Sequence, residues 1–304
     1  MNWLKQIFES LFKPKDKPDL TPYSEEQLNA LKDQITMLEQ ENTRLAKDNN
    51  GYIDKIGENM ALIESLNQQI KNLKGENQMQ EYWDNKRPKA RIVYKGRYLP
   101  MTKTRMNVPV QLFIDTNDID IISDLKHYNL EVTDPNNCDD MILKIYKHTR
   151  TKPLNKYRYV TDIVNVGVSE FWYFPFELRF AKKGDCDDWG NELASYLISA
   201  GVPRYRVRCV VGDTWDGFGH HTVYVLSDDN ATWYHLNSTN PYSLISGKTK
   251  LSQFPKSDDP NDDIGIKDVW FSYNDKSAWH EFETEASAKS FKKEMENIKI
   301  TPEV

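Results

Sequence analysis

The sequence predicts an α+β fold preceded by a long parallel coiled coil. A heptad pattern runs through residues 24–82, and a mixture of helix-type and strand-type periodicity fills residues 88–304. Within the second region, a lone cysteine opens a helix and is followed by histidine and asparagine on strand-like segments. We therefore expect an amphipathic segment and linker over 1–23, a coiled coil over 24–82 and a domain over 88–304.

Composition limits the classes of function. The 304 residues carry a net charge of −6 and no strongly basic region, which argues against nucleic-acid binding. No apolar run approaches the roughly 18 residues of a transmembrane helix, and the N-terminus lacks the features of a secretory signal. The 3 cysteines have no metal-type spacing, so a disulfide framework is not expected and a reducing compartment is plausible.

The N-terminal segment predicts a short amphipathic helix that Pro14 and Pro18 end. Its apolar positions recur at helical spacing: Trp3, Leu4, Ile7, Phe8, Leu11 and Phe12. Such a helix could dock on a protein partner or a membrane surface, or pack on its own chain or oligomer. The pattern does not separate these cases.

The coiled-coil pattern holds its register over about seven heptads. Its seam consists of Leu28, Leu31, Ile35, Leu38, Asn42, Leu45, Asn49, Tyr52, Ile56, Asn59, Ile63, Leu66, Ile70 and Leu73. Isoleucine at a and leucine at d favour a parallel dimer through residues 28–73, with a trimer as the alternative. The polar stretch from Asn49 to Asn59, with two glycines, predicts a flexible or kinked middle.

Residues 88–304 read as a helix-then-meander domain with a core of ample size. Short strands are expected at 92–94 and 108–114. Helices are expected at 139–149, 187–200 and near 284–298. Further strands are expected at 205–211, 221–226, 233–236 and 268–273.

The stretch "GDCDDWGNELASYLISAGVP" places Cys186 at or beside the N-cap of a helix. The unpaired N–H groups and the positive dipole end at that point favour a thiolate, which is the nucleophilic form of cysteine. Asp187 and Asp188 are expected to stabilise the first turn and to point to solvent. Cys138 and Cys209 are expected to be small buried residues.

A general base is expected on "GHHTVYVLSDDNATWYHLNST". If residues 228–230 form the turn, His221 lies directly opposite Asn237, with Cβ atoms about 5 Å apart on one face. An even-numbered turn would instead put them on opposite faces. The predicted triad is Cys186 as nucleophile, His221 as base and Asn237 as orienting residue. His220 is the competing base. A zinc site of Cys186, His220 and His221 is disfavoured for want of a second cysteine, so no metal or cofactor is expected.

These motifs resemble the transglutaminase-like superfamily, most closely its bacterial and phage branch of transglutaminase-like cysteine proteinases. The resemblance covers about 140–275. It rests on Phe171-Trp172, the Pro175-Phe176-Glu177 step and the Gly184–Asp188 motif, followed by "HTVYV" and "WYHLNST". It implies a papain-like core, a Cys-His-Asp triad and amide chemistry through a thioester. The chain departs from the family in having Asn237 where aspartate is usual.

The resemblance implies a cysteine-peptidase-like amide hydrolase acting on a protein substrate. The alternatives are a crosslinking transglutaminase and a weak or inactive structural protein, for example a phage or prophage component. The Cys186 N–H would serve the oxyanion, with Trp172 or Tyr173 supplying a second donor. Trp215 could line the substrate cleft or belong to the core. The expected location is cytoplasmic or virion-associated.

Overall fold

The structure is a computed structural model that describes residues 25–48, 53–99, 104–151, 157–237, 239, 250–258, 265–280, 291 and 297–302. The chain forms two compact units, Met1–Tyr82 and Trp83–Val304. The predicted N-terminal amphipathic helix lies outside the described residues. No helix among the described residues is long and apolar enough to cross a membrane.

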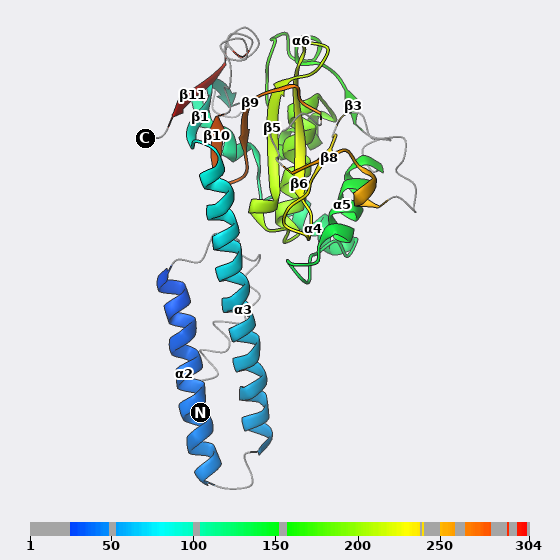
Figure 1. Cartoon of the computed structure of the whole chain (residues 1–304). Helices are drawn as coiled ribbons and strands as arrows, with labels where there is room; N and C mark the ends of the chain where they lie inside the picture. The colour runs from blue at the N-terminus through cyan, green and yellow to red at the C-terminus, as the bar shows by residue number, and fades with distance from the viewer. Residues whose placement is uncertain are drawn as a thin grey trace. The chain divides into compact units, whose positions relative to one another are not determined.

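The first unit contains two helices that pack along their length, α2 (Glu25–Asp48) and α3 (Ile53–Lys86), drawn in blue and cyan in Figure 1. Ile35 of α2 is buried in one apolar cluster with Leu66 and Ile70 of α3. Nearer the other ends of the pair, the Asn59 side-chain amide donates to the Asn42 side-chain oxygen at 2.7 Å. The contacting residue numbers increase along α2 as they decrease along α3, so the two helices form an antiparallel hairpin.

The hairpin corrects the expected single helix through 24–82. The apolar seam positions do pack, but they pack on each other within one chain: Leu28, Leu31, Leu38 and Ile63 surround the buried cluster. The physical reason is the polar middle of the heptad pattern, where the helices end at Asp48 and resume at Ile53. Residues 49–52 lie outside the described residues. Self-association through 28–73 stays a prediction.

The second unit is built around antiparallel β-structure. The strands are β1 (Ala90–Leu99), β2 (Thr104–Pro109), β3 (Arg158–Tyr159), β4 (Lys183–Gly184), β5 (Val207–Asp213), β6 (Gly219–Leu226), β7 (Trp233–Leu236), β8 (Lys256–Ser257), β9 (Asp268–Tyr273), β10 (Ala278–His280) and β11 (Ile298–Pro302). The main sheet has the order β10-β9-β5-β6-β7-β8, and a smaller sheet has the order β11-β1-β2. β3 and β4 form a short parallel pair.

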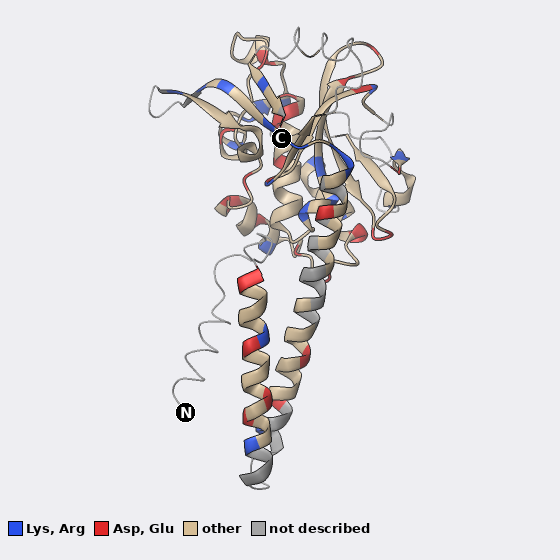
Figure 2. Cartoon of the chain, turned by 60° about the vertical axis from the view of Figure 1, so that its left-hand side comes forward, with Lys and Arg blue, Asp and Glu red and all other residues tan. Residues whose placement is uncertain are grey.

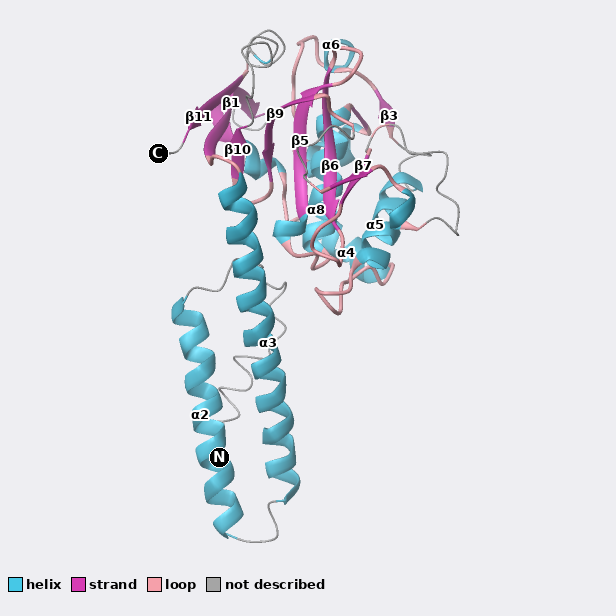
Figure 3. Ribbon diagram, viewed as in Figure 1, coloured by secondary structure: helices cyan, strands magenta, loops and turns pink. Residues whose placement is uncertain are grey.

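Helices of the second unit include α4 (Ile119–His127), α5 (Asp139–Thr151), α6 (Asp162–Asn165), α7 (Pro175–Ala181) and α8 (Cys186–Ser199). The 3-10 turns are Val110–Phe113, Arg204–Arg206 and Leu251–Gln253. α8 covers one face of the main sheet at β5 and β6 (Figure 3). Its side chains are buried almost throughout, since α4, α5 and α7 also contact it.

Several expected elements agree with the structure. The strands over 233–236 and 268–273 are β7 and β9, and the helix over 139–149 is α5 with one added half-turn. The strand expected at 108–114 is wrong beyond Pro109, because residues 110–113 wind into a 3-10 turn. Most of the helix expected near 284–298 lies outside the described residues, while Ile298 already belongs to β11.

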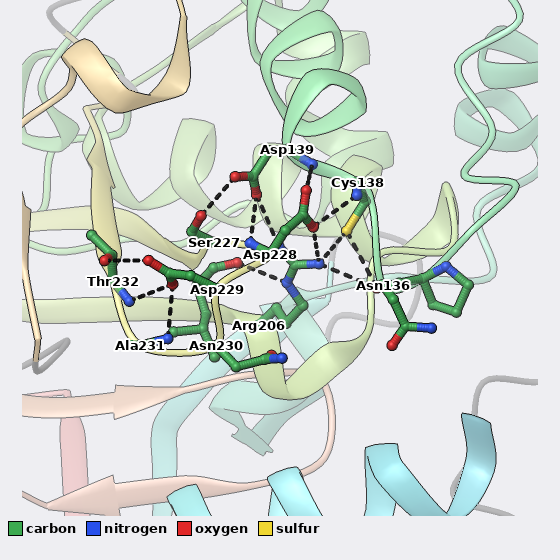
Figure 4. Close-up of polar contacts among 12 residues, drawn as sticks. Asn136, Cys138, Asp139, Arg206, Ser227, Asp228, Asp229, Asn230, Ala231 and Thr232 are labelled. Atoms are coloured by element: carbon green, nitrogen blue, oxygen red, sulfur yellow. Dashed lines mark hydrogen bonds and ion pairs between the residues drawn. The ribbon is translucent and has the colours of Figure 1, made fainter. Parts of the chain in front are cut away.

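A cluster of charged residues around the buried Arg206 ties the β6–β7 turn to the start of α5 (Figure 4). The Asp228 carboxylate accepts the N–H groups of Cys138 at 2.8 Å and Asp139 at 3.1 Å, and so caps the helix. Arg206 donates to Asp228 at 2.7 Å, to Asp139 at 2.9 Å and to the Leu226 carbonyl at 2.7 Å. The conformation of this turn is therefore fixed from outside the hairpin.

Acidic and basic residues are both scattered over each of the two units (Figure 2). This distribution agrees with the low net charge of −6. The expectation that the protein does not bind nucleic acid stays a prediction.

Candidate active site

Cys186 is the first residue of α8 and follows Asp185 at the N-cap. The tight approach of the preceding chain requires glycine at 184, because a Cβ there would lie 2.3 Å from the Asp188 carboxylate. The backbone N–H of His221, on β6, donates a hydrogen bond to the Cys186 sulfur. The start of α8 and the β6 backbone at His221 thus meet at the thiol, and the catalytic pairing of Cys186 with the His221 ring stays a prediction.

The acidic residues around the thiol are buried, which corrects the expectation that Asp187 and Asp188 point to solvent. Their exposed fractions are 3% and 1%. Asp188 is held inward because its carboxylate accepts the N–H groups of Tyr173 at 2.6 Å and Asp185 at 3.1 Å. Asp162, on α6, accepts the Phe171 N–H in the same way.

This acidic surround acts against a thiolate. Burial, followed by the charges of Asp185 and Glu170, raises the pKa of Cys186 well above its ordinary value. Burial and neighbouring carboxylates also raise the pKa of Asp162 to about 9. Several buried carboxylates this close together are stable only when some are protonated or when a cation neutralises their charge.

The same carboxylates fit a divalent cation, although no metal was expected. One oxygen each of Asp162, Asp185 and Asp187 is buried and has no hydrogen-bond partner among the residues that the structure describes. Ligand atoms of Asp162, Asp185 and Asp188 all lie within 4.8 Å of one another, as do those of Asp185, Cys186 and Asp187. A set of carboxylate oxygens is the donor set that Ca²⁺ and Mg²⁺ prefer.

The His221 ring occupies a buried slot between Trp172 and Gly190. Its ring stacks on the Trp172 indole with centroids 5.4 Å apart and planes at 19°. On the other side the ring faces Gly190, where an added Cβ would lie 3.3 Å from two ring atoms. Burial, together with the smaller effect of His220, lowers the pKa of His221 to about 3, so the ring is a neutral base at pH 7.

The β6–β7 register differs from the one on which the predicted pairing of Asn237 with His221 depends, while the orienting role of Asn237 stays a prediction. β6 and β7 pair Val223 with Leu236 and Leu226 with Trp233. One residue further, the same register sets Asn237 opposite Thr222 and on the other face from His221. The cause is an even-numbered turn over 228–231, closed by the Ser227 N–H bond to the Thr232 carbonyl. The Asn237 side-chain oxygen accepts from Thr239 N–H at 2.9 Å.

The other predicted site residues take separate positions. Trp172 is fully buried as one wall of the histidine slot. The Tyr173 N–H is already bonded to Asp188, so it is not placed as an oxyanion donor. Trp215 is not a core residue, because 64% of it is exposed on the β5–β6 turn.

His220 and His235 lie on the opposite face of the sheet from His221 by strand alternation. The His220 Nε2 atom is buried and has no hydrogen-bond partner within the described ranges. Burial lowers the pKa of this ring, and the nearby Asp185 raises it by a smaller amount. His235 bonds Thr222 at 2.8 Å inside the core.

Sequence patterns missed the residues that brace the slot. Arg97, on β1, donates to the Trp172 carbonyl at 2.8 Å and pairs with Glu177, and both contacts are buried. Tyr273, on β9, contacts both the His221 ring and Asn191 of α8. Arg97 lies outside the motif region and carries no local signal. The strand alternation of 268–273 could have placed Tyr273 on an inner face.

No protein-family profile and no curated protein matches the chain. Among solved structures, it is similar to Legionella pneumophila LapG, a bacterial transglutaminase-like cysteine protease, at 19% identity and a TM-score of 0.37, over 62% of this chain and 94% of that one. EGTA-treated LapG gives 18% and 0.37 over the same shares, and calcium-bound LapG gives 19% and 0.35 over 58% and 84%. What this chain does is inferred below from its own residues.

Proposed function

We propose that the protein is a thiol-dependent amide hydrolase with a papain-like core, acting on protein substrates. Cys186 is the nucleophile and His221 is the base. The observation that carries the proposal is the contact between the Cys186 sulfur at the start of α8 and the His221 N–H of β6. Thiol catalysis requires a sulfur at a helix N-terminus and a neutral imidazole that can take its proton, and we propose that the His221 ring fills that second role.

The reaction proceeds in two halves. The Cys186 S–H proton passes to His221 as the sulfur bonds to the amide carbon, and the Cys186 N–H stabilises the oxyanion. The C–N bond then breaks, and the leaving amine takes the proton from His221, which leaves a thioester. Water adds to the thioester, gives a proton to His221 and releases the acid, while the thiol is restored. A lysine amine in place of water would give crosslinking.

A divalent cation, with calcium as our choice, would be held by Asp162, Asp185, Asp187 and Asp188. It would supply positive charge beside the thiol. Support comes from the buried carboxylate oxygens that have no hydrogen-bond partner.

Cation binding is measurable without any substrate. Thermal unfolding with Ca²⁺, with Mg²⁺ and with EGTA should show a higher Tm with Ca²⁺, because a ligand that binds only the folded state stabilises it. Asp162→Asn should abolish the increase, while exposed Asp216→Asn should retain it. A Tm that is indifferent to Ca²⁺ in the wild type would rule out the cation site.

The nucleophile is tested by labelling with iodoacetamide at pH 7, with and without Ca²⁺. Cys186 should react much faster than Cys138 or Cys209, which are both fully buried. His221→Ala should remove the difference and His220→Ala should leave it. The opposite result for the two variants would make His220 the base. Products formed in a lysate by wild type but not by Cys186→Ala, identified by mass spectrometry, would then separate hydrolysis from crosslinking.

The second candidate is a structural or docking protein, for example of a phage particle, with an idle thiol. The observation in its favour is the acidic surround that raises the pKa of Cys186. Slow, equal labelling of all three cysteines, with Ca²⁺ present, would select this candidate.

A further inference from the structure

The buried polar side chains of His221, Tyr273 and Asn191 lie close together in the core. The contact on the histidine ring is at Nε2, the ring nitrogen farther from the His221 backbone. The Tyr273 hydroxyl donates to the Asn191 side-chain oxygen at 2.6 Å and lies 3.3 Å from His221 Nε2. Exposed fractions are 0% for Tyr273 and 1% for His221. Tyr273 is held in place by its own ring, which stacks against Trp172 at 5.9 Å and Phe271 at 6.1 Å.

The hydrogen bonds around Tyr273 specify the tautomer of the imidazole. A phenol has one proton to donate, and here it goes to Asn191, whose amide oxygen can only accept. Towards His221 the hydroxyl oxygen can therefore only accept, so Nε2 must carry the hydrogen. A neutral imidazole has one N–H, which leaves Nδ1 as a bare acceptor.

Nδ1, the ring nitrogen without a hydrogen, is the atom that would accept the Cys186 proton in the proposed reaction. Nδ1 is buried and has no hydrogen-bond partner in the described part of the chain. Along the side chain, Nδ1 is fewer bonds from the His221 backbone than Nε2 is. The backbone N–H of His221 contacts the Cys186 sulfur. Asn237, by contrast, is on the other face of the sheet and accepts from Thr239.

We propose that Tyr273 and Asn191, rather than Asn237, are the positioning residues that hold His221 as the Nε2–H tautomer, with Nδ1 facing the proton of Cys186. This inference rests on the proposed function for its chemical purpose. In the step itself the S–H bond breaks and an Nδ1–H bond forms, while Nε2–H remains bonded to the tyrosine oxygen. The same contacts thus serve the neutral and the protonated ring, and no rearrangement is needed between them.

The tautomer can be measured directly by ¹⁵N NMR of histidine-labelled protein at pH 7, with His221 assigned by its absence from His221→Gln. The wild type should show protonated Nε2 and unprotonated Nδ1. Asn237→Ala should leave this pattern unchanged. Tyr273→Phe keeps the ring but removes the acceptor, so it should give a mixture or the other tautomer. An Nδ1–H wild type, or a pattern that changes in Asn237→Ala and not in Tyr273→Phe, would overturn the inference.

A second readout follows the labelling rate of Cys186. Loss of the one hydrogen bond should lower it about tenfold in Tyr273→Phe, and Asn237→Ala should stay within about twofold. Asn191→Asp keeps an acceptor and should retain the wild-type tautomer, which guards against a misfolded Tyr273→Phe. If Cys186 proves unreactive while the Nε2–H tautomer is present, the proposed function fails and the positioning role of Tyr273 stands.

Discussion

At the scale of single residues, Gly190 shows how little room the histidine slot has. It lies one helical turn after Cys186, and an added Cβ would sit 3.3 Å from His221 Cε1 and Nε2. Because Trp172 blocks the opposite side, the ring cannot yield by moving away. We expect Gly190→Ala to displace the imidazole and to slow Cys186 labelling about tenfold or more. Gly75→Ala, where the new Cβ meets nothing within 4 Å, is the control. Unchanged labelling in Gly190→Ala would mean that His221 does not serve the thiol.

Single residues also show which features of the site can be predicted from the sequence and which cannot. Glycine, cysteine and the following helical spacing locate Cys186 at a helix start, because each is a local property. Burial of Asp187 and Asp188 is not local: it depends on N–H groups that arrive from the segment around Tyr173. The contacts of Tyr273 with His221 and with Asn191 form only when α8 packs on the sheet. No spacing along the sequence therefore predicts them.

At the scale of elements, the β6–β7 turn decides which residues can share a face. Its conformation is fixed by Asp228, which caps α5 and pairs with buried Arg206. Burial alone would raise the pKa of Asp228, but the N–H groups of Cys138 and Asp139, together with Arg206, hold it below its usual value. Alternation within β6 and β7 was readable from the sequence. The register between them was not, because it depends on this contact with a helix about ninety residues away.

Removing that carboxylate should destabilise the domain. Asp228→Ala leaves two helix-start N–H groups without their acceptor and Arg206 with one carboxylate fewer. We expect the free energy of unfolding to fall by about 1–3 kcal/mol in urea titrations. Exposed Asp216→Ala should change it by less than about 0.5 kcal/mol. Equal effects of the two variants would show that the cluster does not hold the turn.

Buried His235 on β7 should make stability depend on pH. Burial lowers its pKa to about 3 from an ordinary value of about 6.5, so between these values the unfolded chain binds more protons than the folded one. Its contribution to stability is therefore lost as pH falls from about 6.5 towards 3. In His235→Gln the slope of unfolding free energy against pH should decrease by up to about 1.4 kcal/mol per pH unit in that window. A wild-type slope in His235→Gln would contradict the assignment.

At the scale of the whole molecule, the apolar seam of the heptad pattern can pack in either of two ways: within one chain as a hairpin, or between two chains as a parallel dimer. In the hairpin, Ile35 packs with Leu66 and Ile70 of the same chain, and Asn42 bonds Asn59 at 2.7 Å. In the parallel dimer predicted from the heptads, each a-position residue instead meets its own copy. The heptad pattern identifies the seam equally well in either case, since both arrangements bury the same positions. The contacts between α2 and α3 of one chain distinguish them.

Cysteine crosslinking separates the two arrangements, because they give position 35 different neighbours. If the hairpin is the solution structure, Ile35→Cys/Leu66→Cys should oxidise to a disulfide within one chain, seen as a faster band on a non-reducing gel at monomer mass. Ile35→Cys alone should then stay monomeric. In a parallel dimer the single variant would crosslink to its own copy, since both lie in one a layer. All variants are made in Cys186→Ala, where the remaining Cys138 and Cys209 are fully buried. A crosslinked dimer from Ile35→Cys alone would contradict the hairpin and restore the oligomer.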